Sequence, residues 1–245
     1  MTNVMITMAG MGKRFRDAGY AGPKYTIKVH QKTLFTWSML SLRSFYKSGA
    51  KFIFVVQRAD QAVSFIYQEC QSLGISSIKI IEIDGVTDGQ ATTALFGESA
   101  IDAPYDPFLV YNIDTFVHPD ALPIESVRGD GFVPCFPGEG DGFSFALADE
   151  HGLIIDLKEK VRISSHATVG FYWFSSFHLY AQTYHDYYRD LSRLEKGEKY
   201  IAPMYRQMIQ TGQSVFLHAV QKDAVIPLGT PAEVGDFLNR QAPVI

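Results

Sequence analysis

The chain alternates short apolar runs with segments in which apolar residues recur at helical spacing. Four runs have the length and the branched or aromatic side chains of buried strands: 3–9, 52–56, 78–83 and 108–111. Between them, three segments have the pattern of helices that bury one face: 34–46, 62–73 and 92–99. This alternation predicts parallel strands joined by helices that cover both faces of one sheet.

The pattern changes in the second half of the chain. Shorter strand-like runs near 131–136, 143–148, 153–157 and 168–174 are interrupted by Gly-Asp-Gly and Glu-His-Gly turns, which indicates antiparallel pairing. No internal repeat or low-complexity linker divides the chain. We therefore expect one domain over residues 1–245, with an α/β fold: a Rossmann-like three-layer sandwich with a mostly parallel mixed sheet and a small antiparallel excursion beside it.

Composition narrows the class of protein. Hydrophobic residues make up 47% and charged residues 20% of the 245 positions, which is ordinary for a globular protein, and the net charge of −4 argues against a nucleic-acid partner. No apolar stretch approaches the roughly 18 residues of a membrane span, and no targeting segment is evident, so we expect a cytoplasmic protein with no membrane partner. Its two cysteines cannot form a disulfide framework, and its seven histidines lack the spacing of a zinc site.

The first apolar run leads into a glycine-rich loop, Gly10-Met11-Gly12-Lys13-Arg14-Phe15, with Pro23-Lys24 following. Two glycines let the backbone turn tightly and bring its N–H groups close to an anion, while three basic side chains supply positive charge: Lys13, Arg14 and Lys24. The pattern predicts a cradle for a nucleoside triphosphate. The alternative is a plain strand-to-helix turn with basic residues on the surface.

Two better-known phosphate loops do not fit. A dinucleotide-binding turn needs a small residue where Phe15 stands and an acidic residue near His30. A Walker A loop needs a glycine at Thr7 and a hydroxyl residue at Arg14. The cradle therefore belongs to another class.

The segment Ala9–Phe15, followed by Gly22-Pro23-Lys24, resembles the signature of the nucleotidyltransferases that join a nucleoside triphosphate to a sugar 1-phosphate. Five further segments occur in the order that the family shows: Asp88–Thr93, Asn112–Asp114, Glu159–Val161, Thr168–Tyr172 and Gly229–Pro231. The resemblance covers nearly the whole chain. It implies a nucleotide-binding half over 1–115 and an acceptor-binding half over 116–245, in which the antiparallel excursion holds the acceptor.

The resemblance also implies roles for individual residues. Catalysis would fall to Arg14, Lys24 and Asp114, nucleotide binding to Ala9, Gly10, Met11, Gly12, Lys13, Gly89, Gln90 and Asn112, and acceptor binding to Glu159, Lys160 and Gly170. Lys24 would bridge the reacting phosphates, Asp114 would hold Mg²⁺, and Gln90 would read the base with its amide. Each has a plainer alternative: a solvated lysine, a turn aspartate, and a turn at Asp88-Gly89. Glu159 and Lys160 could likewise be an ordinary surface pair.

Some positions depart from the family pattern. Relatives often carry a second metal-binding aspartate where Pro227 stands, and Asp223 is the nearest carboxylate, so we expect Asp114 and Asp223 to be the metal ligands. Val161 and Tyr25 replace prolines. These departures affect the identity of the acceptor more than the type of reaction.

The sequence thus predicts a Mg²⁺-dependent enzyme that transfers a nucleotidyl group from a nucleoside triphosphate to a sugar phosphate or related small phosphorylated acceptor. It would release pyrophosphate and serve capsule or surface polysaccharide biosynthesis. Two alternatives stay open: a glycosyltransferase that uses Asn112-Ile113-Asp114 as its metal motif, and a nucleotide sensor without catalysis. An aromatic stripe over 177–191 predicts a core helix or, alternatively, the face of a homodimer.

Overall fold

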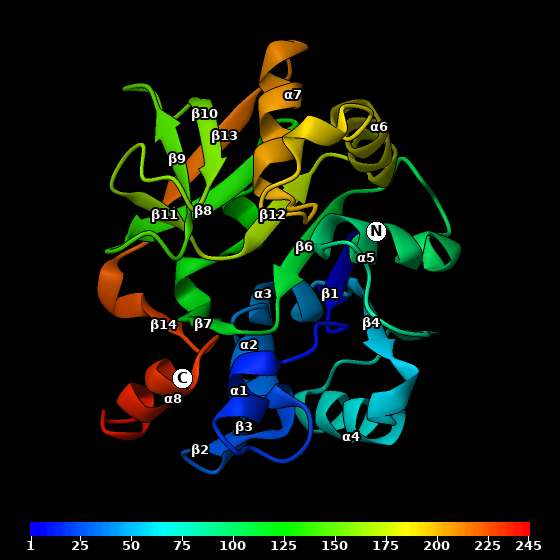
Figure 1. Ribbon diagram of the computed structural model, residues 1–245, viewed down its shortest axis with the longest axis vertical. Coiled ribbons are helices and arrows are strands. Elements are labelled where there is room, and N and C mark those ends of the chain that lie inside the picture. Colours follow the sequence, from blue (N-terminus) through cyan, green and yellow to red (C-terminus); the bar gives the residue numbers. More distant parts are fainter.

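The computed structural model describes residues 1–245 and contains one ten-stranded sheet with helices on both sides (Figure 1). The sheet consists of β1 (Asn3–Thr7), β4 (Lys51–Gln57), β5 (Ile78–Ile83), β6 (Phe108–Asn112), β8 (Gly131–Pro137), β9 (Ser144–Ala148), β10 (Ile154–Glu159), β11 (His166–Thr168), β12 (Phe171–Phe174) and β13 (Val215–Ala219). Two small sheets pair β2 (Lys28–Val29) with β3 (Lys32–Thr33) and β7 (Thr115–Val117) with β14 (Val225–Pro227). The helices are α1 (Lys13–Asp17), α2 (Leu34–Leu40), α3 (Arg43–Lys47), α4 (Val63–Leu73), α5 (Gln90–Leu95), α6 (Phe177–Tyr187), α7 (Tyr205–Gln210) and α8 (Pro231–Leu238).

The sheet is mixed, and its two kinds of pairing are separated along it. Strands β5, β4, β1 and β6 are parallel to one another, as the alternating apolar runs predict. From β6 onward the pairs β6–β12, β12–β8, β8–β11, β11–β9 and β9–β10 are antiparallel, while β13 adds to β8 in parallel. The α/β fold class is confirmed. The antiparallel strands, however, continue the same sheet instead of standing beside it, because β12 pairs directly with β6.

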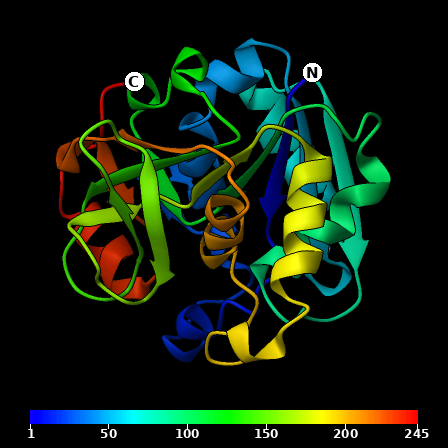
Figure 2. The same cartoon turned by 90° about the horizontal axis from the view of Figure 1, so that it is seen from above.

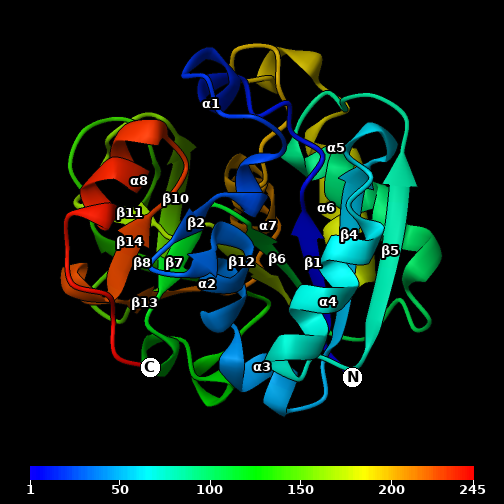
Figure 3. The same ribbon diagram turned by 90° about the horizontal axis from the view of Figure 1, so that it is seen from below.

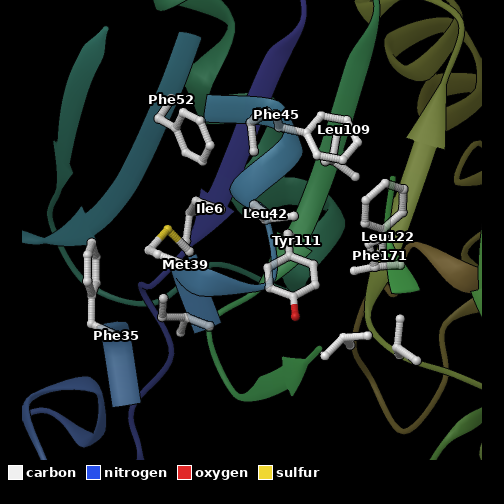
Figure 4. Close-up of a cluster of buried hydrophobic side chains, with 14 of the residues drawn as sticks. Ile6, Phe35, Met39, Leu42, Phe45, Phe52, Leu109, Tyr111, Leu122 and Phe171 are labelled. Atoms are coloured by element: carbon white, nitrogen blue, oxygen red, sulfur yellow. The ribbon is translucent and has the colours of Figure 1, made fainter. Parts of the chain in front are cut away.

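Both faces of the parallel strands are buried. Alternate residues of β1 point to opposite faces, so that Val4 and Ile6 join one apolar cluster and Met5 joins another. Helices α2, α3 and α4 cover the first face, which is the near face in Figure 3, and Figure 4 shows the side chains between them and the sheet. Helices α5, α6 and α7 cover the second, and α6 and α7 are nearest the viewer in Figure 2. This is the expected three-layer arrangement.

A third, smaller cluster joins the two ends of the chain. Phe15 of α1 and Trp37 of α2 pack with Phe237 of α8, and all three side chains are almost fully buried. The cluster holds α1, which follows the glycine-rich loop, on the same apolar body as the Gly229–Pro231 segment that precedes α8. Segments more than 200 residues apart in sequence are thereby fixed in one region.

Some predicted elements are divided in the structure. The helix expected over 34–46 is two helices, α2 and α3, because the backbone leaves helical geometry at Leu42 and the Ser41 hydroxyl accepts a hydrogen bond from the Val117 amide at 2.9 Å. The strand expected over 168–174 is interrupted at Gly170, whose φ of 78° turns the chain between β11 and β12. Tertiary partners, which the local pattern does not contain, cause both interruptions.

The aromatic stripe on α6 is core. Phe177, Tyr180, Tyr184 and Tyr187 are at most 6% exposed, and the Tyr180 hydroxyl donates to the Ala91 carbonyl at 2.5 Å. The stripe therefore packs inside the monomer, and a homodimer stays a prediction without support from this helix. No helix of the protein combines the length and the apolar character needed to cross a bilayer.

Candidate active site

A cavity of about 700 Å³ opens at the carboxyl ends of β1, β4 and β6. This edge of a parallel sheet is where ligands usually bind in α/β proteins. Nearly all lining residues come from the first half of the chain, and Glu198 alone comes from the second: the predicted residues among them are Ala9, Gly10, Met11, Gly12, Lys24, Gly89, Gln90, Asn112 and Asp114. The fold therefore brings together most of the predicted nucleotide-binding residues.

The glycine-rich loop is shaped by its anchors. Gly12 has a φ of 59° and starts α1, and a Cβ placed on Gly10 or Gly12 would have no neighbour within 4 Å, so the backbone there faces open space. On one side the Ala9 carbonyl accepts a hydrogen bond from the Gln57 side chain at 2.7 Å, and on the other Phe15 is buried. A fixed backbone with an accessible surface is what close contact with a phosphate requires.

Of the three basic side chains expected here, only Lys24 lines the cavity. Lys13 and Arg14 are exposed and do not line the cavity, because α1 begins directly after the left-handed turn at Gly12 and the Lys13 ammonium lies 2.6 Å from the Asp17 carboxylate, one helical turn away. Arg16 lines the cavity instead. The sequence pattern gave no signal for Arg16, since its position depends on the direction in which α1 leaves the loop.

Lys24 and Asp114 form an ion pair in the cavity. The Lys24 Nζ lies 2.8 Å from Asp114 Oδ2, although the residues are 90 positions apart in the chain. The side chains are 22% and 31% exposed, so the pair is partly shielded but open to a ligand. A solvated lysine and an unrelated turn aspartate would not meet in this way. The pair places one mobile positive charge and one carboxylate at the same point of the cavity.

A second carboxylate stands near Asp114. The Asp114 carbonyl accepts a hydrogen bond from the Leu228 amide at 2.8 Å, which brings Gly229 alongside. A methyl group on Gly229 would lie 3.4 Å from Asp114 Oδ2 and 3.6 Å from Glu233 Oε2, so the two carboxylates flank this glycine. The sequence hides Glu233, because Thr230-x-x-Glu233 is the pattern of a helix cap, and the Thr230 hydroxyl does accept from the Glu233 amide.

The structure does not bring Asp223 to Asp114. Strand β14 pairs antiparallel with β7, so Pro227 is opposite Thr115, next to Asp114, and Val225 is opposite Val117. Asp223 precedes the far end of β14, where it is exposed and does not line the cavity. The nearest carboxylate in sequence is thus at the wrong end of an extended strand.

The Gln90 side chain bridges the carboxyl ends of β1 and β6. Its amide nitrogen donates to Thr7 Oγ1 at 3.2 Å and to Asn112 Oδ1, so both of its N–H groups already have partners. Its carbonyl oxygen remains the group that a base could reach. The backbone amide of Asn112 in turn donates to the Gly170 carbonyl at 2.9 Å.

Gly89 has a structural reason to be glycine. It has a φ of 144°, and a Cβ there would lie 2.3 Å from the Lys199 carbonyl oxygen. The Ala91 amide donates to this same oxygen at 3.0 Å. The backbone of Lys199 leaves no space for a side chain at position 89. Glycine is therefore needed there for a contact within the protein, and not only for a ligand.

Two of the three predicted acceptor residues, Glu159 and Lys160, form a partly buried network outside the cavity, whereas Gly170 contacts Asn112 and does not line the cavity. Glu159 is only 7% exposed and accepts a hydrogen bond from the Ser144 hydroxyl, and burial raises the pKa of its carboxyl group. Lys160 Nζ lies 3.4 Å from Glu159 Oε1 and donates to the Tyr200 hydroxyl at 2.7 Å. A surface pair is thus the wrong description. Sequence reasoning missed Tyr200, which gives no local signal.

Comparison with known proteins agrees with this arrangement. No protein-family model and no curated protein matches the chain. A solved nucleoside-diphosphate-sugar pyrophosphorylase from Vibrio cholerae is 35% identical, with a TM-score of 0.89 over 97% of this chain and 100% of that one. The chain belongs to the sugar-phosphate nucleotidyltransferases. The family resemblance, the fold class and the assignment as an enzyme are confirmed.

Two more distant structures match the fold of this nucleotidyltransferase. An inositol-1-phosphate CTP transferase from T. maritima is 16% identical, and a Bacillus anthracis protein described as a glucose-1-phosphate thymidylyltransferase is 14% identical. Both have a TM-score of 0.75 over 98% of this chain, and cover 95% and 94% of their own length. At this identity they support the fold alone.

Replacing Gln90 tests base reading by the nucleotidyltransferase. With Gln90→Ala, we expect the preference among the four triphosphates, as ratios of kcat/KM, to fall by a factor of roughly 10 to 100, because a wrong base no longer leaves the Gln90 carbonyl oxygen without a partner. Gln71→Ala, at an exposed position on α4, is the control. Unchanged ratios in Gln90→Ala would assign Gln90 to structural support of Asn112.

Proposed function

We propose that this nucleotidyltransferase moves a nucleotidyl group from a nucleoside triphosphate to a sugar phosphate or a related small phosphorylated acceptor and releases pyrophosphate. The observation that carries the proposal is the Lys24–Asp114 pair in a glycine-lined cavity of about 700 Å³. The 35% identical pyrophosphorylase supports the same reaction type. The Glu159–Lys160 network offers a charged amine for the acceptor.

The reaction needs no protein nucleophile. An oxygen of the acceptor phosphate forms a bond to the α-phosphorus of the triphosphate, and the bond from that phosphorus to the bridging oxygen breaks, so that the electron pair leaves with pyrophosphate. The protein aligns these oxygens and offsets their charge, which is catalysis by positioning and electrostatics. The glycine-rich loop would hold the triphosphate, and the ammonium of Lys24 would follow the charge that develops on the reacting phosphates.

The carboxylates suit a hard cation. Asp114 and Glu233 present carboxylate oxygens near the same point beside Gly229, which is the donor type that Mg²⁺ takes, with phosphates and water completing its shell. We therefore assign Asp114 as the main protein ligand of Mg²⁺ and Glu233, in place of Asp223, as the second carboxylate. When bound, the ion supplies positive charge against the triphosphate. The Lys24 ammonium at 2.8 Å from Asp114 offsets the charge of the carboxylate in its absence.

An activated sugar is a donor for glycan assembly, so the product would serve capsule or surface polysaccharide biosynthesis. This part of the proposal rests on the reaction type. The cavity supports a mononucleotide donor and small acceptor, and the negative net charge of the chain does not favour a nucleic-acid partner.

A substrate panel tests the proposed function. Four triphosphates are combined with several sugar 1-phosphates and inositol 1-phosphate in the presence of Mg²⁺, and pyrophosphate release and product mass are measured. We expect one base and one acceptor class to dominate. Binding of a triphosphate without product from any pair would favour a sensor, whereas sugar transfer from a nucleotide sugar would favour a glycosyltransferase.

A further inference from the structure

The segment Glu198–Tyr200, between α6 and α7, is the one part of the second half that reaches the cavity. Figures 2 and 3 show this yellow stretch beside the blue segment that contains α1. Its three side chains have different partners. Glu198 lines the cavity, Lys199 Nζ lies 2.7 Å from Asp88 Oδ2, and the Tyr200 hydroxyl accepts a hydrogen bond from Lys160 Nζ at 2.7 Å.

The backbone of Glu198–Tyr200 is hydrogen-bonded to the loop Asp88–Ala91. The Lys199 amide donates to the Asp88 carbonyl at 2.8 Å, and the Lys199 carbonyl accepts from the Ala91 amide at 3.0 Å. The Tyr188 hydroxyl donates to the Tyr200 carbonyl at 2.5 Å. Hydrogen bonding to Asp88 raises the pKa of Lys199, so this lysine stays charged. The position of Tyr200 is therefore set by groups on both sides of it.

The Tyr200 hydroxyl accepts a hydrogen bond from the Lys160 ammonium at 2.7 Å. Burial raises the pKa of Tyr200 although the hydrogen bond from Lys160 lowers it, so the phenol stays neutral. On the other side, Lys160 is 3.4 Å from Glu159. The Tyr200 hydroxyl and the Glu159 carboxylate are thus the two polar partners of the Lys160 ammonium, and they lie on different sides of it.

We propose that Tyr200 is a positioning residue, which keeps the Lys160 ammonium directed away from Glu159 and available to the acceptor phosphate. Without the hydroxyl, the Lys160 ammonium would turn toward the buried carboxylate of Glu159. Its charge would be offset there and less available to a phosphate. Because Glu198–Tyr200 is also hydrogen-bonded to the loop Asp88–Ala91, it fixes the Lys160 ammonium relative to the bound triphosphate. The inference rests on the proposed function for its acceptor, but not for the contact itself.

The kinetic test uses Tyr200→Phe. We expect the KM for the phosphorylated acceptor to rise about tenfold or more, since a hydrogen bond to a charged group is lost, while the KM for the triphosphate changes less than about twofold. Tyr67→Phe, at a half-exposed tyrosine on α4, is the matched control and should leave both constants unchanged. In a Lys160→Met background, Tyr200→Phe should raise the acceptor KM no further, because the hydroxyl acts through the amine.

A second measurement does not depend on turnover. The rate of Lys160 acylation is followed by mass spectrometry as a function of pH. Burial opposes the charged form, but the hydrogen bond to Tyr200 and the charge of Glu159 raise the pKa of Lys160 overall, so removal of the Tyr200 hydroxyl should shift the midpoint, whereas Tyr67→Phe should leave it unchanged.

The outcomes separate this inference from the proposed function. An unchanged acylation midpoint together with an unchanged acceptor KM would overturn the role of Tyr200. Equal increases in both KM values would also overturn it, because they would indicate a general disturbance of the segment. If the wild-type protein shows no turnover with any substrate pair, the proposed function fails, and the acylation profile still decides whether Tyr200 controls Lys160.

Discussion

Lys24→Ala should lower kcat by a factor of about 10² or more while the protein stays folded. The ammonium lies 2.8 Å from Asp114 in the cavity, and a flexible point charge at this place can follow negative charge as it builds on the reacting phosphates. That contact strengthens in the transition state, so its loss lowers kcat more than it raises KM for the triphosphate. The measurement is steady-state pyrophosphate release with the best substrate pair, alongside thermal unfolding.

Lys47→Ala provides the control for this prediction. Lys47 is an exposed lysine in the last turn of α3 that does not line the cavity, and its removal should leave kcat unchanged. Thermal midpoints of the two variants should agree within a few degrees, because neither side chain fills core volume. A Lys24→Ala enzyme with kcat near that of the wild type would show that the lysine only neutralises Asp114.

Asp114→Asn should abolish metal-dependent turnover. The change is isosteric and keeps the backbone hydrogen bond from Leu228, so the turn after β6 is preserved while the anionic ligand is lost. We expect calorimetry to show no tight Mg²⁺ binding by the apo protein, and metal binding in the presence of a triphosphate to be lost in Asp114→Asn. Retained activity would contradict the metal assignment and favour a structural turn.

Two further carboxylates provide matched comparisons for Asp114. Glu233→Gln keeps the Thr230 cap and should raise the Mg²⁺ concentration for half-maximal activity by roughly 10-fold, whereas Asp223→Asn should leave it unchanged. The calorimetric affinity for metal in the presence of a triphosphate should follow the same order. An effect of Asp223→Asn without an effect of Glu233→Gln would reverse our assignment of the second carboxylate.

The sequence was sufficient for the elements whose signals are local. Buried strands such as β1 and β4 are continuous apolar runs, and the loop after β1 carries its glycines within six residues, so the position of the cradle follows from the chain itself. The ordered motifs also predicted that Lys24 and Asp114 would share a site. Asp114 directly follows β6, whereas Lys24 returns to the same edge of the sheet through α1 and the loop after it, so the motif order and not the strand pairing alone predicted their meeting across 90 residues.

Other parts of the site depend on how helices and strands are oriented relative to one another, which the local sequence pattern does not predict. The left-handed turn at Gly12 decides that Arg16, and not Arg14, faces the cavity. The antiparallel register of β14 decides that Asp223 lies away from Asp114. Glu233 and Tyr200 come from a helix cap and a loop that reach the site only through tertiary contacts. These residues could be found only after the elements were placed.

The direct pairing of β12 with β6 has a mechanical consequence. Hydrogen bonds of the β-ladder, together with that from the Asn112 amide to the Gly170 carbonyl, join the part that carries the glycine-rich loop to the part that carries Glu159 and Lys160. A hinge between them would have to break this ladder in the middle of a continuous sheet. Closure around the substrates therefore belongs to the loops at the rim, and the frame that aligns the two phosphates is rigid before either one arrives.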